Sequence, residues 1–267
     1  MIEIENEHFN LRQIALSGQC FRMDMTDDGS CVCIAGDKSL RASQDGSRIF
    51  FGCENDEFEE FWKNYFDLGV DYGKYISAID KNDEYLCAAA KKGIGIRILN
   101  QEIWETTVSF LISQQNNIAR IKKCISNICR KYGEHKETSD GTEYFAFPKP
   151  EALARLSEDA LMECNLGYRS KYVVRTARAV CDGFELKELY NLPYEDARTR
   201  LMTLYGVGKK VADCICLFSL HNIDAFPIDT HIKQVLAEHY PNGFPFERYE
   251  GFAGVLQQYI FYYDLHK

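Results

Sequence analysis

Hydrophobic and polar residues follow two different periods along this chain. In residues 1 to about 55, short alternating runs such as Cys31–Ala35 and Ser47–Gly52 are separated by Asp-Asp-Gly, Gly-Asp and Asp-Gly turns. From Glu57 the spacing becomes helical, and four aromatic residues recur on one helical face: Phe58, Phe61, Trp62 and Tyr65. The pattern predicts an N-terminal antiparallel β region followed by a helix whose aromatic stripe packs into a core.

Helical periodicity dominates the rest of the chain. We expect a loop over 133–150 and helical segments over 75–100 (interrupted at 91–97), 102–132, 150–164, 171–181, 201–236 (interrupted by a Gly-Val-Gly turn) and 252–265. Together with the β region, these segments predict an α+β protein.

Three polar stretches each allow two interpretations. Four consecutive amides, Gln114 to Asn117, either cap or bend the long helix or offer donors and acceptors to base edges. The turn at 17–19 is a plain strand entry or a close backbone approach at Gly18. The turn at 167–169 is a helix C-cap or a surface that presents an aromatic ring and a guanidinium to DNA. The residues alone leave these alternatives open.

Composition narrows the class of protein. The chain has 267 residues, 46% hydrophobic and 27% charged, which is ordinary for a soluble globular protein of one large or two modest domains. No run approaches the roughly 20 apolar residues of a membrane span. The acidic N-terminus lacks the order of a signal peptide. We therefore expect a cytoplasmic protein, associated with the nucleoid if bacterial or archaeal, without a membrane partner.

Cysteine usage and charge refine this picture. The eleven cysteines are odd in number, lack a C-x-x-C pair and fall partly on apolar helix faces, so structural thiols are expected rather than disulfides or a zinc site. The net charge of −9 argues against a protein that coats nucleic acid indiscriminately. It leaves room for a local DNA-binding patch, because 120–131 and 169–178 are basic.

The most specific chemistry lies in Leu201–Leu236. Gly206-Val207-Gly208 forms a tight hairpin, over about 204–210, at the start of a helix, where free N–H groups and the helix dipole favour an anion such as a DNA phosphate. The G-x-x-x-x-G-K-[ST] pattern of a P-loop is absent. Hairpin and helix therefore predict a contact to one DNA backbone.

Lys210 and Asp229 are the candidate catalytic pair. Lys210 stands in the first turn of the helix after the hairpin, with Cys214 one turn further on the same side. The helix dipole opposes a cation there and favours the neutral, nucleophilic amine; the alternative is a solvated surface lysine. Asp229 precedes the next helix, where aspartate is a common N-cap. A capping carboxylate is fixed in position, so capping and catalysis are compatible.

On these motifs the sequence resembles the helix–hairpin–helix DNA glycosylases, the HhH-GPD superfamily, and within them the 8-oxoguanine DNA glycosylases. The matching stretches keep the family order over nearly the whole chain: Ser17–Arg22, Asn116–Ile121, Gly167–Arg169, Gly206–Cys214 and Pro227–His231. The C-terminal match, Gly254–Phe261, is weaker and leaves two registers open at the family's glutamine position, Gln257 and Gln258, of which we take Gln257. The family's run of three asparagines reads Gln115-Asn116-Asn117 here.

The resemblance implies a role for each matching residue. Lys210 would attack the sugar C1′ and hold the DNA as a Schiff base, while Asp229 would stabilise the cationic sugar. The residues around the flipped base would be Gly18, Gln257, Phe261 and Cys214. DNA contacts would come from Asn116, Asn117, Arg120, Tyr168, Arg169, Gly206, Val207, Gly208 and His231.

The resemblance also implies an architecture and an activity. A β-rich domain similar to the TATA-binding protein, with flanking helices, would occupy 1–98, and a mostly helical HhH-GPD domain would occupy 99–267. We expect a monomer that excises 8-oxoguanine from duplex DNA and then cleaves the strand by β-elimination. No cofactor is expected, and no iron–sulfur cluster, because no cysteine follows Cys216. The alternatives are a glycosylase for another lesion and a non-catalytic DNA-binding module; the latter requires neither Lys210 nor Asp229.

Overall fold

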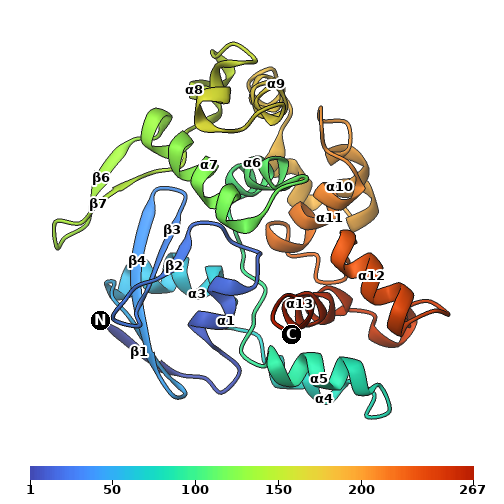
Figure 1. Cartoon of the computed structure of the whole chain (residues 1–267). Helices are drawn as coiled ribbons and strands as arrows, with labels where there is room; N and C mark the ends of the chain where they lie inside the picture. The colour runs from blue at the N-terminus through green and yellow to red at the C-terminus, as the bar shows by residue number, and fades with distance from the viewer.

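The computed structural model describes residues 1–267, and its N-terminal part is built on a five-stranded antiparallel sheet. The sheet order is β1-β5-β4-β3-β2 (Figure 1). The strands are β1 Ile2–Glu5, β2 Met23–Met25, β3 Cys31–Ala35, β4 Lys38–Asp45 and β5 Arg48–Phe51. The predicted antiparallel β region is confirmed.

The predicted aromatic stripe covers this sheet. It lies on one irregular helix made of α2 Asn55–Glu57, a π-helical turn Phe58–Trp62 and α3 Lys63–Tyr65. Phe58, Trp62 and Tyr65 are buried and belong to a separate N-terminal cluster of 19 buried hydrophobic residues. The interpretation of the stripe as core is confirmed.

Within the β region, the structure contains a helix that the sequence pattern missed. Helix α1, Leu11–Leu16, begins after Asn10, whose side chain accepts a hydrogen bond from the Gln13 N–H at 2.9 Å. Six residues are too few to show a helical period against their neighbours. Prediction of β structure at this point was wrong, and the consequence is functional, because α1 leads directly into Ser17 and Gly18.

The remaining chain is mostly helical, as predicted. Its α-helices are α4 Tyr72–Ser77, α5 Glu84–Lys92, α6 Ile103–Ser113, α7 Ile118–Tyr132, α8 Pro150–Ala154, α9 Arg169–Cys181, α10 Tyr194–Leu201, α11 Lys209–Phe218, α12 Thr230–His239 and α13 Ala253–Leu265. Short 3₁₀ turns are η2 Ala160–Cys164, η3 Leu186–Asn191 and η4 Phe246–Tyr249. No helix combines the length and apolar content that crossing a membrane requires.

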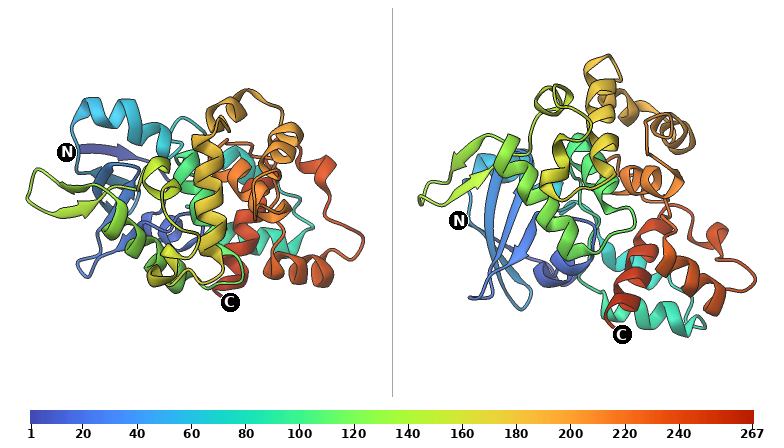
Figure 2. Two further views of the ribbon diagram at one scale, coloured as in Figure 1. Left: turned by 90° about the horizontal axis from the view of Figure 1, so that it is seen from above. Right: turned by 45° about the horizontal axis from the view of Figure 1, so that its top comes forward.

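Two predictions in this part were wrong in detail. Residues 133–150 were expected to be a loop but contain the hairpin β6 His135–Glu137 and β7 Glu143–Phe145, which projects from the molecule (Figure 2). The helix expected over 150–164 ends at Ala154 and resumes as a 3₁₀ turn at Ala160. An apolar pattern does not distinguish an α-helix from a short helix followed by a 3₁₀ turn, because both bury similarly spaced residues.

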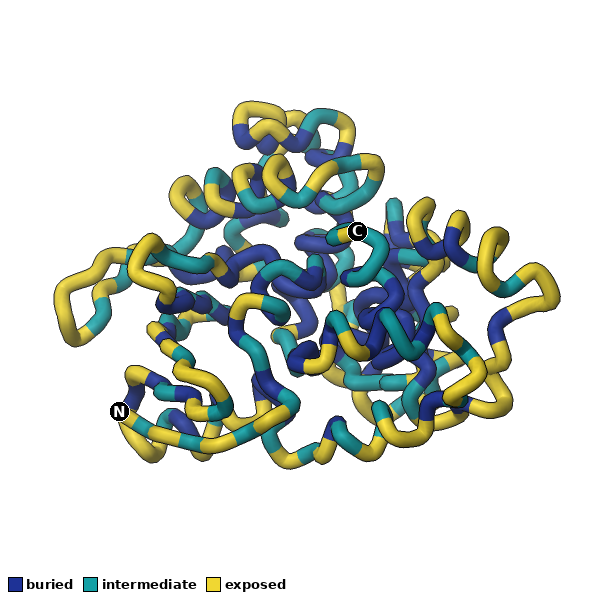
Figure 3. Tube along the Cα trace, turned by 60° about the horizontal axis from the view of Figure 1, so that its bottom comes forward, coloured by how far each residue is buried: buried dark blue, intermediate teal, exposed yellow.

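A second cluster of 52 buried hydrophobic residues forms the main core. Its centre includes α13, in which every residue from Ala253 to Ile260 is buried, and buried segments gather in the interior of the trace (Figure 3). Leu86 and Ala89 of α5 belong to this cluster rather than to the N-terminal one. The predicted boundary at residue 98 falls in the extended stretch between α5 and α6 and stays a prediction.

A buried ion pair joins the sheet to the helical part. Arg22 Nη1 lies 3.3 Å from Glu105 Oε2 of α6, and the same carboxylate accepts the Gly36 N–H at 2.7 Å. Burial raises the pKa of Glu105, although the Arg22 charge acts in the opposite direction. A buried pair of this kind fixes the orientation of two elements more than it adds stability.

Candidate functional site

The hairpin between α10 and α11 presents free backbone N–H groups. Helix α11 begins at Lys209, and its N-cap, Gly208, provides no side-chain capping group. The N–H groups of Gly206, Gly208, Lys209 and Lys210 donate to no group of the protein. An uncapped helix start of this kind carries partial positive charge and suits an anion.

Lys210 and Asp229 lie near the same buried thiol. The charges of both side chains influence the pKa of Cys214, which burial raises to about 11. Lys210 is half-buried, with Nζ 5.2 Å from the centre of the Phe110 ring. Asp229 caps α12 by accepting the Ile232 N–H at 2.9 Å. The structure thus brings together Lys210, Cys214 and Asp229, the three side chains that the sequence singled out in this region. With its raised pKa, the Cys214 thiol stays protonated near neutral pH.

Gly18 and Phe261 form a second part of the site. Gly18 has φ +75°, and an added β-carbon would lie 2.9 Å from Cε1 of Phe261. The Gly18 carbonyl accepts no hydrogen bond from the protein. An unoccupied acceptor beside a half-buried aromatic ring can receive one N–H from a planar ligand stacked on that ring.

Buried amides hold the Gly18 loop in place. Gln258 Nε2 donates to the Ser17 carbonyl at 2.6 Å. Gln19 donates to the Arg97 carbonyl and accepts from the Leu99 N–H, both at 2.8 Å. The loop is therefore fixed from α13 on one side and from the stretch between α5 and α6 on the other.

Gln257 differs from Gln258 in having capacity left for a ligand. Its Nε2 donates to the Pro227 carbonyl at 3.0 Å, two residues before Asp229. Its buried Oε1 has no partner, which is uncommon for a buried polar atom. Gln257 is also one helical turn before Phe261, so both lie on one side of α13. Gln257 thus retains a free acceptor, whereas the amide of Gln258 is used by the Ser17 carbonyl, and the predicted role of Gln257 in recognition stays a prediction.

His231 lies at the edge of the same region. Its Nδ1 is 3.2 Å from Asp264 Oδ2, and its ring meets the Phe261 ring edge-on at 6.1 Å between centres. Partial burial opposes ionisation of Asp264, but hydrogen bonds from Lys267 and His231 outweigh it and lower the pKa of that carboxyl. Asp264, which the sequence did not single out, thus orients a predicted DNA-contact residue.

The amide cluster at the break between α6 and α7 forms an exposed loop. Gln115 has φ +47° and is exposed, and Asn117 caps α7 by accepting the Arg120 N–H at 2.9 Å. Asn116 donates from Nδ2 to the Ile112 carbonyl at 3.1 Å. Arg120 is exposed, with only one long contact, 3.4 Å, to the Asn165 carbonyl. Capping and presentation of polar groups are therefore both present, and the two interpretations of this cluster are compatible.

Tyr168 and Arg169 differ sharply in exposure. The Tyr168 side chain is 42% exposed, whereas Arg169 is 3% exposed. Arg169 donates from Nε to the Gln114 carbonyl at 2.7 Å and from Nη2 to the Gln115 carbonyl at 2.8 Å. In this conformation Tyr168 is available to DNA, while Arg169 supports the loop; its predicted contact to DNA stays a prediction.

The sequence analysis gave no role to Phe110 or Asp264, and it did not foresee the long-range hydrogen bonds of Gln19, Gln114 and Gln258. These three glutamines bond to distant main-chain carbonyls. The one available signal was an amide within an apolar context, as in the run from Gly254 to Phe261. Such a residue predicts a buried polar bond but not its partner.

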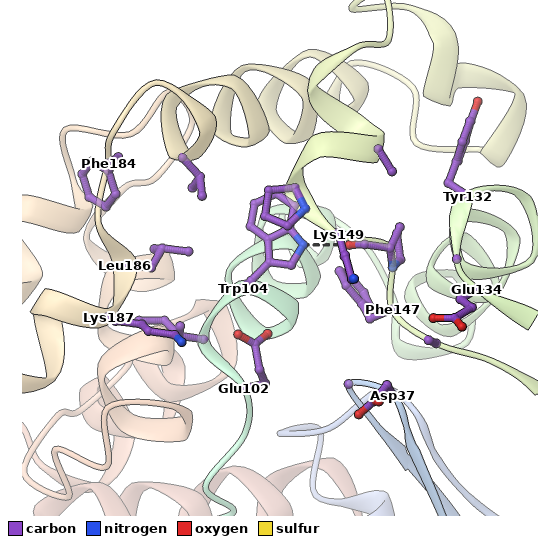
Figure 4. Close-up of a pocket in the computed structure, with 18 of the residues that line it drawn as sticks. Asp37, Glu102, Trp104, Tyr132, Glu134, Phe147, Lys149, Phe184, Leu186 and Lys187 are labelled. Carbon is purple, nitrogen blue, oxygen red and sulfur yellow. Dashed lines mark hydrogen bonds between the residues drawn. The ribbon is translucent and has the colours of Figure 1, made fainter. Parts of the chain in front are cut away.

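A large cavity lies elsewhere in the structure. It has a volume of about 850 Å³ and is lined in part by Trp104, Phe147, Lys149, Phe184 and Lys187 (Figure 4). Trp104 donates from its indole to the Pro148 carbonyl at 2.9 Å. None of the predicted site residues lines this cavity. Its size alone therefore does not make it the functional site, since it lies apart from Lys210, Asp229 and the other predicted site residues.

Two family models match the chain. The 8-oxoguanine DNA glycosylase N-terminal domain matches residues 1–107, and the HhH-GPD superfamily of base excision DNA repair proteins matches residues 108–243. The N-glycosylase/DNA lyase of Saccharomyces cerevisiae is 40% identical over 158 residues, which cover 55% of this chain and 42% of the relative. The Arabidopsis thaliana N-glycosylase/DNA lyase is 38% identical over 164 residues, covering 60% of this chain and 45% of the relative. The match thus spans less than half the length of either curated relative.

A solved structure is similar over the full chain. It is the Clostridium acetobutylicum 8-oxoguanine glycosylase/lyase in complex with double-stranded DNA containing cytosine opposite 8-oxoguanine. That protein is 34% identical, and the match covers 100% of this chain and 98% of that chain with a TM-score of 0.92. The predicted order of a β domain followed by a helical domain is confirmed by this likeness.

Proposed function

The chain belongs to the HhH-GPD superfamily of base excision DNA repair proteins and carries the N-terminal domain of the 8-oxoguanine DNA glycosylases, and we propose that it excises 8-oxoguanine from duplex DNA and then cleaves the strand by β-elimination. The observation that carries this proposal is the contact of Gly18 with Phe261. It combines a carbonyl without a protein donor with a ring on which a flipped base can stack.

Lys210 is the proposed nucleophile. Its amine attacks C1′ of the damaged nucleotide, the bond from C1′ to the base breaks, and the base leaves with the bonding electrons and a proton. The C1′–O4′ bond of the sugar ring then breaks, O4′ takes up a proton, and C1′ becomes doubly bonded to the lysine nitrogen as a protonated Schiff base. This Schiff base makes the adjacent C2′ proton acidic, and loss of that proton eliminates the 3′ phosphate. Asp229 stabilises the positive charge on the sugar, and its carboxylate is held for this task by the Ile232 N–H.

The proposed pocket discriminates against undamaged guanine with one hydrogen bond. The N7 of 8-oxoguanine carries a proton and donates to the Gly18 carbonyl, whereas guanine would place a lone pair there. Such a mismatch in a dry site costs about 1–3 kcal/mol. Phe261 stacks on the flipped base, Gln257 Oε1 accepts from its Watson–Crick edge, and the protonated Cys214 lines the pocket.

The DNA contacts follow from exposure and free donors. Gly206 and Gly208 bind phosphate through their free backbone N–H groups, whereas the N–H of Val207, the third predicted hairpin contact, already donates to the Leu204 carbonyl. Binding through backbone N–H groups requires little positive charge and so accommodates the net charge of −9. Tyr168 wedges into the stack from which the base has left. Asn116, Asn117 and Arg120 contact the orphaned cytosine, Arg169 holds their loop, and His231 contacts the backbone beside the flipped base. The protein acts as a monomer in the compartment that holds the DNA.

Borohydride trapping tests this proposal directly. Duplexes carry 8-oxoguanine opposite each of the four bases, and wild type is compared with Lys210→Gln. We expect a covalent adduct, strongest opposite cytosine, that disappears in Lys210→Gln while lesion binding persists. Release of base without an adduct would remove the lyase step. If neither an adduct nor a released base appears, two alternatives remain: a glycosylase for a different lesion and a non-catalytic DNA-binding protein. A screen of other damaged bases separates these two alternatives.

A further inference from the structure

Hydrogen bonds from three parts of the chain meet at one residue, Gln114. Its Nε2 donates to the Gly206 carbonyl of the hairpin at 3.1 Å and to the Leu111 carbonyl of α6 at 3.2 Å. Its own main-chain carbonyl accepts from Arg169 Nε at 2.7 Å. Gln114 thus begins the α6–α7 loop and bonds to the hairpin through its side chain and to Arg169 through its main chain, although these segments are distant in sequence.

Gly206 is fixed on two sides. Its φ is +91°, and an added β-carbon would lie 2.6 Å from Cγ of the Tyr172 ring. Its carbonyl bonds to Gln114, and the N–H of the same peptide group, that of Val207, donates to the Leu204 carbonyl at 3.0 Å. The peptide group between Gly206 and Val207 is thus hydrogen-bonded within the protein through both its C=O and its N–H. The N–H groups of Gly206 and Gly208, by contrast, have no protein acceptor and remain free for phosphate.

We propose that Gln114 is a positioning residue that fixes the phosphate-binding hairpin relative to the loop at Gln115–Asn117. The hairpin then binds the phosphate and the loop contacts the orphaned base in one defined geometry. This inference rests on the proposed excision function. Lys210 follows Gly206 by four residues, so the hydrogen bond from Gln114 to Gly206 also fixes the position of the Lys210 amine relative to the gap left by the flipped base. A misplacement of about 1 Å at a reacting centre can lower a rate about a hundredfold.

The hydrogen bonds of the Gln114 side chain can be removed without changing those that Arg169 donates to the main chain. Gln114→Met keeps the length of the side chain and removes its N–H donors, while the main-chain carbonyl that accepts from Arg169 remains. Gln114→Glu keeps the size and cannot donate when ionised, so it provides a second variant. A matched control is Gln44→Met, because Gln44 Nε2 donates to the Phe9 carbonyl at 2.7 Å within the N-terminal part.

The experiment measures single-turnover excision on an 8-oxoguanine–cytosine duplex and entry of the loop into the gap. Gap entry is read from 2-aminopurine placed opposite a tetrahydrofuran abasic site, which the enzyme binds without reacting. Gln114→Met and Gln114→Glu should slow excision about tenfold or more and reduce the 2-aminopurine signal. Affinity for undamaged duplex should change less than about threefold. Gln44→Met should excise at the wild-type rate.

The possible results separate this inference from the proposed function. Wild-type excision rate and gap signal in both Gln114 variants would overturn the positioning role. So would an equal loss of excision in Gln44→Met at a similar fall in melting temperature, because that pattern reports general destabilisation. Failure of the wild type to release 8-oxoguanine would instead contradict the proposed function, and the abasic duplex would still show whether the hydrogen bonds of the Gln114 side chain control entry of the loop.

Discussion

Gly18 and Phe261, from opposite ends of the chain, are in contact so close that a β-carbon on Gly18 would lie 2.9 Å from the Phe261 ring. Two buried glutamines, Gln19 and Gln258, fix the Gly18 loop on one side of this contact, and Phe261 lies on α13, the helix that carries Gln258. The proposed specificity for a damaged base therefore depends on the fixed position of the Gly18 carbonyl beside the Phe261 ring. Rigidity is required because one hydrogen bond discriminates only when the competing base cannot shift away from it.

Gly18→Ala should abolish excision of 8-oxoguanine while leaving the chain folded. The new methyl group fills space at the Phe261 ring, and the left-handed backbone adds strain of about 1–2 kcal/mol. Gly46→Ala is the matched control, because Gly46 has φ +62° and no atom within 4 Å of an added β-carbon. Both variants should remain folded, with Gly18→Ala losing more thermal stability because its methyl group also displaces the Phe261 ring, and only Gly18→Ala should lose excision. Equal excision activities in the two variants would show that Gly18 takes no part in recognition of the damaged base.

Arg120 and Arg169 should respond differently to removal. Arg120→Ala removes an exposed guanidinium with one long contact, so it should relax the preference for cytosine opposite the lesion at little cost in stability. Arg169→Ala removes the guanidinium donors to the Gln114 and Gln115 carbonyls, whereas the Leu166 carbonyl keeps the main-chain N–H of residue 169, and the change should cost about 2–4 kcal/mol of folding free energy. Denaturant unfolding and excision opposite all four bases measure both effects. An unchanged stability in Arg169→Ala would contradict its clamping role.

The buried carboxyl of Asp213, on α11, predicts a defined pH dependence. Burial raises its pKa above the usual 3.8, although a hydrogen bond from Tyr194 and the charge of Arg198 act in the opposite direction. A raised pKa means that the folded chain binds this proton more tightly than the unfolded chain. Its contribution to stability is therefore present below pH 3.8 and is lost as the pH rises through the folded pKa.

Asp213→Asn removes this titration and retains an oxygen that can accept from Tyr194. The stability of the wild type relative to this variant should therefore fall as the pH is raised from about 4 toward neutrality. Thermal unfolding across that range, in one buffer of constant ionic strength, measures the difference. A difference that grows in the other direction would show that the Arg198 and Tyr194 contacts outweigh burial.

Cysteine reactivity should be concentrated at one position. Cys181, at the end of α9, is the exposed cysteine, whereas Cys214 is buried with a pKa of about 11. Iodoacetamide near neutral pH should modify Cys181 first in the native protein and leave Cys214 intact, because the thiolate is the reactive form. Mass spectrometry of alkylated wild type and Cys181→Ser checks this. Rapid labelling of Cys214 would indicate that the site opens in solution.

Local sequence chemistry predicted much of the candidate site. The Gly206–Gly208 turn, the start of α11 near Lys210 and the cap at Asp229 depend on backbone preferences and on hydrogen bonds that span only a few residues. The same local rules predicted the strands and their turns. They missed α1 and the break after Ala154, where the elements are too short for a period to emerge.

Tertiary structure alone decided which of these residues meet and which are available to DNA. No pattern distinguishes Gln257, with its unpartnered oxygen, from Gln258, whose amide is used by Ser17. Nor does a Tyr-Arg pair reveal that the tyrosine is exposed and the arginine buried. These outcomes depend on contacts between segments far apart in the chain, where the cost of burying a polar group selects its partner. The sequence by itself determined the kinds of group in the site, and long-range packing determined their positions and their free hydrogen-bonding capacity.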